Sequence, residues 1–128
     1  MSYFISKVIS SDFDDAVIRV TEKLKTEGFG VLTEIDVKET LKKKIDVNFR
    51  KYKILGACNP PNAYKALSYE PNIGLLLPCN IVVQESNNGE IEVSAVNPKV
   101  SMQSVNNPDL ENVAEDISSR LERVIKSL

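Results

Sequence analysis

Residues 79–96 read CNIVVQESNNGEIEVSAV, and this stretch decides the fold. Apolar and polar residues alternate on both sides of Asn87-Asn88-Gly89, which is typical of half-buried strands. An Asn-Gly pair favours the tight turn of a β-hairpin, because both residues tolerate a positive φ. The stretch therefore predicts two antiparallel strands, Cys79 to Ser86 and Glu90 to Val96.

Two amphipathic helices are predicted near the ends of the chain. After a strand at Tyr3 to Ser10, Ser11 is placed to cap a helix that ends at Gly28. Its apolar residues recur at spacings of four, three and four positions, which gives one helical stripe: Phe13, Val17, Val20 and Leu24. A last helix opens at Asn107-Pro108-Asp109 and keeps one apolar face from Leu110 to Leu128.

The middle of the chain supplies two further strands, predicted at Gly30–Val37 and Val47–Cys58 and joined by a short helix. Another short helix follows Asn59, which suits a helix cap, and Pro60, which suits the first helical position. Residues 73–78 are predicted to form a buried connector, because four of the six are Leu or Ile.

The predicted order is β-α-β-β-β-β-α with short inserted helices, in one domain spanning residues 1–128. Consecutive strands with a hairpin near the end favour an antiparallel sheet. The fold class is therefore α+β, with a sheet of about five strands and two long helices packed on one face.

The amino-acid composition argues against several classes of function. The 128 residues are 42% hydrophobic and 27% charged, which is a globular balance. The net charge of −2 gives no reason to expect nucleic acid as a partner, and the absence of histidine excludes imidazole chemistry. No apolar run approaches the ~20 residues of a membrane span, and the start lacks a signal-peptide pattern, so we expect a cytoplasmic protein.

Two Cys-Asn segments form the most specialised region. Cys58-Asn59 closes one predicted strand and Cys79-Asn80 opens another, with a proline beside each pair. If these strands are neighbours in an antiparallel sheet, the two segments meet. Cys58 also precedes a predicted helix N-terminus, where free backbone N–H groups favour a thiolate.

Three interpretations of the cysteines remain open from the sequence. Free cysteine is often a small buried apolar residue. Alternatively, Cys58 is a nucleophile with Cys79 as resolving thiol, or both bind a metal ion. The cysteines lie 79 − 58 = 21 positions apart and neither belongs to a Cys-x-x-Cys pair, so a zinc site needs ligands from a second copy.

Other charged residues are weaker candidates. Glu34 and Asp36 share one face of a predicted strand, where two carboxylates suit acid/base chemistry or a hard metal ion. They equally suit the solvated side of a sheet. The lysines and arginine between Lys42 and Lys53 are typical of a solvated surface.

Three segments together resemble the domain of unknown function family numbered 302: GFGVLTEIDV (28–37), YKILGACNP (52–60) and IGLLLPCN (73–80). The resemblance covers nearly the whole chain. It implies a fold like the half-repeat of the TATA-box-binding protein, β-α-β(4)-α, and a small bacterial or archaeal homodimer. It implies no substrate, cofactor or catalytic residue, and a shared fold with a DNA binder does not imply DNA binding.

The sequence thus favours a binding module that holds a small ligand or a metal ion around Cys58, Asn59, Cys79 and Asn80. A thiol-based redox or carrier protein and a purely structural dimer are the alternatives. Neither the cofactor nor any catalytic activity follows from the residues.

Overall fold

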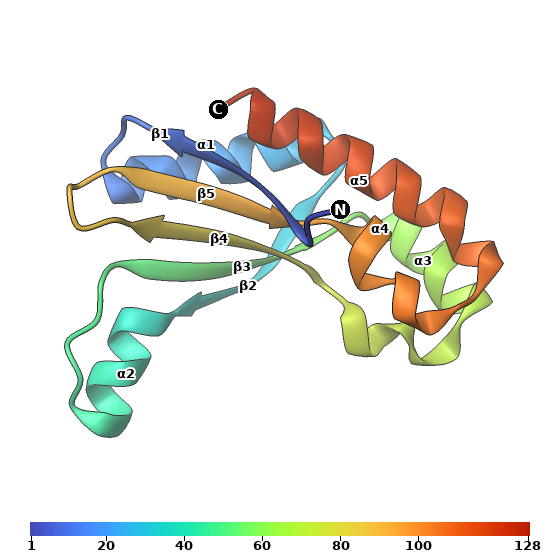
Figure 1. Ribbon diagram of the computed structural model, residues 1–128, viewed down its shortest axis with the longest axis horizontal. Helices are drawn as coiled ribbons and strands as arrows, with labels where there is room; N and C mark the ends of the chain where they lie inside the picture. The colour runs from blue at the N-terminus through green and yellow to red at the C-terminus, as the bar shows by residue number, and fades with distance from the viewer.

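Five antiparallel strands form a single sheet in the order β1-β5-β4-β3-β2 (Figure 1). The computed structural model describes residues 1–128. The α+β fold class predicted from the sequence is confirmed, as is the order of strands and long helices. The strands are β1 (Phe4–Ile9), β2 (Gly30–Asp36), β3 (Tyr52–Cys58), β4 (Cys79–Glu85) and β5 (Ile91–Val96).

The hairpin between β4 and β5 lies where the Asn-Gly pair predicts it. Gly89 has a φ of +82°, a conformation that favours glycine, and the Ser86 backbone N–H donates to the Glu90 carbonyl across the turn at 2.8 Å. The pairing places Val83 opposite Val93. Buried and less buried residues alternate along β4 and β5, so one face of each strand is buried.

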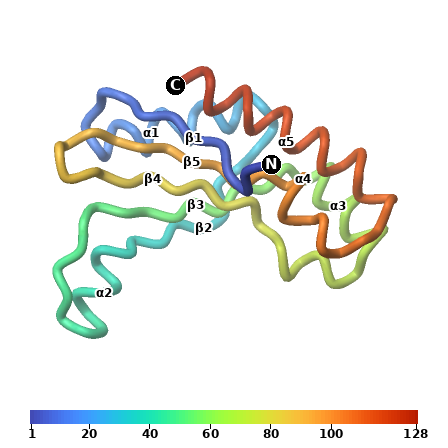
Figure 2. The backbone as a smooth tube through the Cα atoms, viewed as in Figure 1, coloured from blue at the N-terminus to red at the C-terminus, as the bar shows by residue number.

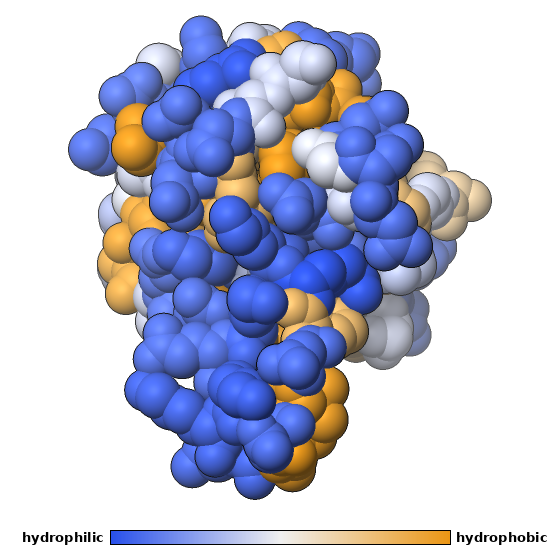
Figure 3. Space-filling model, turned by 90° about the vertical axis from the view of Figure 1, so that its left-hand side faces the viewer, coloured by the Kyte–Doolittle hydropathy of each residue, from blue (hydrophilic) through white to orange (hydrophobic).

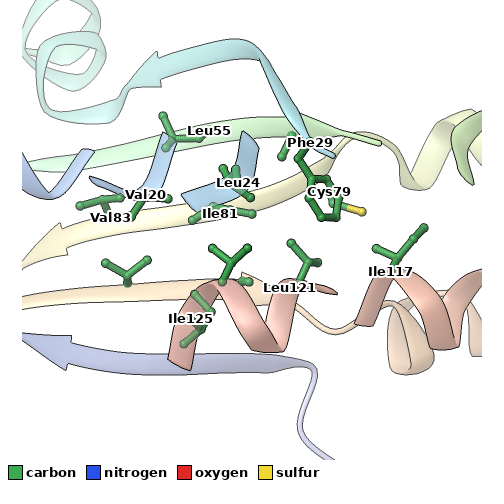
Figure 4. Close-up of a cluster of buried hydrophobic side chains, with 14 of the residues drawn as sticks. Val20, Leu24, Phe29, Leu55, Cys79, Ile81, Val83, Ile117, Leu121 and Ile125 are labelled. Atoms are coloured by element: carbon green, nitrogen blue, oxygen red, sulfur yellow. The ribbon is translucent and has the colours of Figure 1, made fainter. Parts of the chain in front are cut away.

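Two long helices cover that buried face. They are α1 (Phe13–Thr26) and α5 (Glu111–Lys126), and each buries the apolar stripe predicted from its sequence. Figure 4 shows Leu24 of α1 and Leu121 of α5 packed against Ile81 of β4. All three side chains are completely buried. The core of 25 residues therefore lies between the sheet and these two helices.

The residue that caps α1 lies one position later than predicted. Asp12, and not Ser11, is the N-cap, and its carboxylate accepts a hydrogen bond from the Asp15 backbone N–H at 3.4 Å. The negative charge of Asp12 also interacts favourably with the positive end of the helix dipole, which a serine hydroxyl does not. The Ser11 hydroxyl donates to the Asp12 carbonyl instead.

Shorter helices connect the strands at the two ends of the sheet. The chain leaves β2 through α2 (Val37–Ile45) at one end, and leaves β3 through α3 (Pro60–Tyr69) and η1 (Pro71–Leu76) at the other, as Figure 2 traces. After β5 come α4 (Pro98–Ser101), η2 (Gln103–Val105) and η3 (Pro108–Leu110). No helix is both long and apolar enough to cross a membrane.

Three further local predictions differ from the structure. Strand β3 begins at Tyr52 and not at Val47, because residues 46–51 form an irregular connection after α2. The last helix proper begins at Glu111, after the single turn of η3. Residues 73–78 are not a buried connector: only Ile73 is buried, and the Leu75 side chain is 86% exposed.

Candidate functional site

The pairing of β3 with β4 brings the two Cys-Asn segments together. Cys58 is the last residue of β3, Cys79 is the first residue of β4, and the register places Ala57 opposite Cys79 and Gly56 opposite Asn80. Strand β2 flanks the same end, with Gly30 opposite Cys58. The end of the sheet beside α3 and η1 is therefore where the sequence candidates meet.

Close packing fixes the entry to β4. Pro78 and Thr33 lie directly against Gly56, so a Cβ at that position would lie 2.7 Å from the Pro78 Cγ and closer still to the Thr33 Oγ1. No side chain larger than hydrogen fits there without displacing one of these neighbours. The absent side chain of Gly56 thus lets Pro78 lie flat on β3 just before Cys79.

A cavity of about 290 Å³ opens at this end of the molecule. Strands β2 and β3, helices α3 and α5, and η1 all contribute to its wall, and none of its twelve lining residues is charged. Both cysteines and Asn59 are among them. The larger apolar side chains of the lining are Phe29, Leu32, Leu67, Leu77, Pro78 and Ile117.

The two thiols differ in environment. Cys79 is only 5% exposed and points into the space beside Phe29, away from Ile81 and Val83 (Figure 4). Burial raises the pKa of its thiol to about 11, and the nearby Cys58 adds to the rise. Cys58 is partly exposed, and both cysteines are free. Cys79 is therefore a neutral thiol at ordinary pH, without a hydrogen-bond partner in the protein.

Asn59 holds the start of α3 in place. It is 8% exposed and acts as N-cap, its side-chain oxygen accepting from the Asn62 backbone N–H at 3.3 Å. Its side-chain nitrogen donates to the Glu27 carbonyl at the end of α1 at 3.2 Å. Gly28 makes this contact possible, because a Cβ there would lie 3.0 Å from that nitrogen. Asn59 is thus committed to the protein's own backbone.

A polar network behind the cavity anchors α3 to α5. The Asn62 side chain donates to the Asp116 carboxylate at 2.8 Å, and Arg120 Nε donates to the same oxygen at 3.0 Å. These two donors lower the pKa of Asp116. Arg120 also reaches the Glu27 carbonyl at 3.1 Å, and Arg123 pairs with the Glu27 carboxylate at 2.9 Å and lowers its pKa.

Sequence reasoning missed this network. Its partners Glu27 and Arg123 lie 96 positions apart, and only the i,i+4 spacing of Asp116 and Arg120 within one helix hints at any part of it.

The remaining candidates lie away from the cavity. Asn80 is exposed on the open face of the sheet and does not line the cavity. Glu34 pairs with Lys53 at 2.7 Å and raises the pKa of that lysine. Asp36 is the N-cap of α2 and accepts from the Glu39 backbone N–H at 2.9 Å. Each of these two carboxylates therefore has a structural partner.

The metal alternative finds no complete site within one chain. No group of three or more Cys, Asp or Glu side chains is positioned to hold a metal ion. The two thiols alone offer half of a tetrahedral set.

Comparison with known proteins finds matches over nearly the whole chain. Residues 5–128 match the family described as "Domain of unknown function DUF302". The chain belongs to this family. A solved structure described as an uncharacterized conserved protein DUF302 from Bacillus stearothermophilus is 31% identical, covers 98% of each chain and superimposes with a TM-score of 0.92. The chain has no significant match among curated proteins. The resemblance seen in the three sequence segments is thereby confirmed.

Proposed function

We propose that this DUF302 chain is a binding module for a small apolar molecule, which it holds in the cavity beside Cys58 and Cys79. The observation that carries the proposal is the cavity itself: about 290 Å³, uncharged, and formed where three strands meet α3 and η1. Ligand sites are usually concave, mostly apolar and supplied with few polar groups. Here the polar side chains of the lining are the two cysteines and Asn59, and the Asn59 amide is already bonded to the backbone.

The thiol-redox alternative is less well supported. A resolving cysteine must ionise and reach its partner sulfur, and burial works against ionisation of Cys79 because it raises its pKa to about 11. The register also places Ala57, and not Cys58, opposite Cys79. Two free cysteines do fit a reducing compartment, so we propose a cytoplasmic location.

We also propose that two copies associate through the uncovered face of the sheet. That face carries partly exposed apolar side chains, including Phe4, Val8 and Ile35. Helix α2, which follows β2, buries no residue and leaves Ile45 64% exposed. Figure 3 shows hydrophobic surface at the lower end of the molecule, where α2 lies, beside a largely hydrophilic surface. A nine-residue helix is not stable without a packed face, so a covering partner is expected.

Charge supports a second copy as that partner. Lys44 in α2 and Lys51 after it make no ion pair within the chain, and neither do Glu90 and Glu92 on the opposite side of the sheet. The β2 side and the β1–β5 side exchange places about a two-fold axis that runs along the strands. Such an axis brings the lysines of each copy to the glutamates of the other, as an isologous interface requires.

Native mass spectrometry of freshly purified protein tests both proposals in one spectrum. We expect a dimer that carries one small apolar molecule per chain, which an organic extract then releases for identification. A metal adduct in place of the organic molecule would contradict the apolar ligand, and an adduct-free monomer would contradict both proposals. The matched variants for the dimer are Lys44→Glu, which weakens it, and Lys44→Glu with Glu92→Lys, which restores it.

A further inference from the structure

Two exposed leucines line the cavity, and two more follow one of its lining residues in the chain. Leu32 and Leu67 line the cavity and are nevertheless 68% and 45% exposed, and Leu75 and Leu76 of η1, next to the lining residue Gly74, are 86% and 39% exposed. Leucines exposed in this number on neighbouring elements mark a surface that binds something apolar. The apolar surface therefore continues from the inside of the cavity to its rim.

The inner wall offers no group that would recognise a charged or strongly polar ligand. The only amide in the lining, Asn59, already donates to Glu27 and accepts from Asn62. The only fully sheltered polar group without a partner is the Cys79 thiol, a weak donor on a soft, polarisable sulfur. Both observations favour hydrocarbon as the inserted part of a ligand.

The volume sets the length of that hydrocarbon. An apolar protein cavity of about 150 Å³ holds one benzene molecule, with six carbons. At about 290 Å³, this cavity is open on one side and has room for somewhat less than twice as many, or about eight to ten. A molecule of that size enters at the rim and still leaves one end among the exposed leucines.

We propose that the ligand is a single-chain amphiphile whose alkyl chain, about eight to ten carbons long, fills the cavity while its head group stays in water at the leucine rim. This inference rests on the proposed binding function and specifies its ligand class. The chain replaces water against Phe29, Leu77 and Ile117, and the Cys79 sulfur contacts its inner end.

A series of straight-chain primary alcohols from 1-butanol to 1-dodecanol tests the proposal, with binding followed by shifts of backbone amide NMR signals. Each added methylene should tighten binding about fourfold while the cavity fills. The gain should end at about eight to ten carbons, and the shifts should concentrate at Phe29, Cys79 and Ile117. Toluene is the compact comparison probe.

Replacing Leu67 with Ser should weaken the longer alcohols more than 1-butanol, because Leu67 contacts only the outer part of the chain. Replacing Leu77 with Ala should weaken all of them. Toluene binding at the same residues, with alcohol affinities that do not change with length, would overturn the alkyl ligand and leave the proposed site intact. A folded protein that shows no shifts with either probe would overturn the site together with its ligand.

Discussion

Ala57 of β3, and not Cys58, lies directly opposite Cys79 of β4. Side chains of successive strand residues point to opposite faces, so the Cys58 and Cys79 Cβ atoms leave their strands in opposite directions. A disulfide needs Cβ atoms within roughly 4.5 Å of each other and directed toward one another. Both residues line the cavity, but their thiols are not placed to bond.

Mild oxidation of the native protein should therefore leave the intrachain disulfide unformed. Treatment with oxidised glutathione, followed by intact-mass measurement, should show free thiol at Cys79 and at most a mixed disulfide at Cys58. The same treatment in urea is the control, since an unfolded chain allows the bond. Complete conversion of the native chain to a Cys58–Cys79 disulfide would restore the redox interpretation.

The buried thiol should make stability fall at alkaline pH. The folded-state pKa of Cys79 is raised to about 11, whereas an unfolded cysteine ionises near ~8.5. Between these values the folded chain keeps a proton that the unfolded chain releases, so ionisation favours unfolding. The stability that the protonated Cys79 thiol contributes is fully present below the unfolded pKa and is lost as the pH rises toward 11. The loss is about 3 kcal/mol at most.

Urea unfolding of reduced protein at several pH values between 8 and 11 measures this loss. Lysine and tyrosine also titrate in that range, so the comparison is with Cys79→Ala, whose stability should fall less steeply. Parallel curves for the two proteins would show that the Cys79 thiol is not buried as described.

Gly56 should tolerate no side chain. A methyl group there collides with Pro78 and Thr33, so Gly56→Ala should lower the free energy of unfolding by about 1–3 kcal/mol. Gly30 lies in the neighbouring strand, where a Cβ would meet nothing within 4 Å, and Gly30→Ala should be close to neutral. Chemical denaturation of both variants checks the contrast, and equal losses would mean that the β3–Pro78 contact is misplaced.

The core should depend on Leu121 of α5 and not on Leu75 of η1. Leu121 is fully buried against the sheet, and Leu121→Ala should cost about 2–5 kcal/mol. Leu75→Ala removes the same atoms from an 86% exposed position, so it should change the midpoint of urea unfolding very little. A comparable shift for the two variants would place the Leu75 side chain in the core.

The fold was predictable where local physics decides it. The apolar stripes of α1 and α5 and the Asn88-Gly89 turn each depend on residues a few positions apart, and all three occur as predicted. The leucines of η1 failed as a burial signal, because hydrophobicity alone does not say whether a partner surface exists. Here Leu75 and Leu76 find no such surface and stay exposed.

The candidate site was predictable only in part. Neighbouring strand ends were predicted to bring Cys58 and Cys79 together, and both residues line one cavity. Asn80 lies on the other face of the sheet, because successive strand residues point to opposite faces. Helix α3 forms part of the cavity wall, and hydrogen bonds of Asn59, Asn62 and Asp116 hold its start. These contacts join residues as far as 54 positions apart. Contacts at such separations leave no periodic pattern in the sequence.

The central claim, that the cavity beside the cysteines is a ligand site, is tested most directly by filling it. Ala63 lines the cavity from α3, whereas Ser68 is exposed on the same helix and is not part of the lining. In an NMR titration with 1-octanol, wild type and Ser68→Phe should show the same saturable shifts at Cys79 and Ile117, and Ala63→Phe should show none while keeping its fold. Binding that persists unchanged in Ala63→Phe would contradict the account.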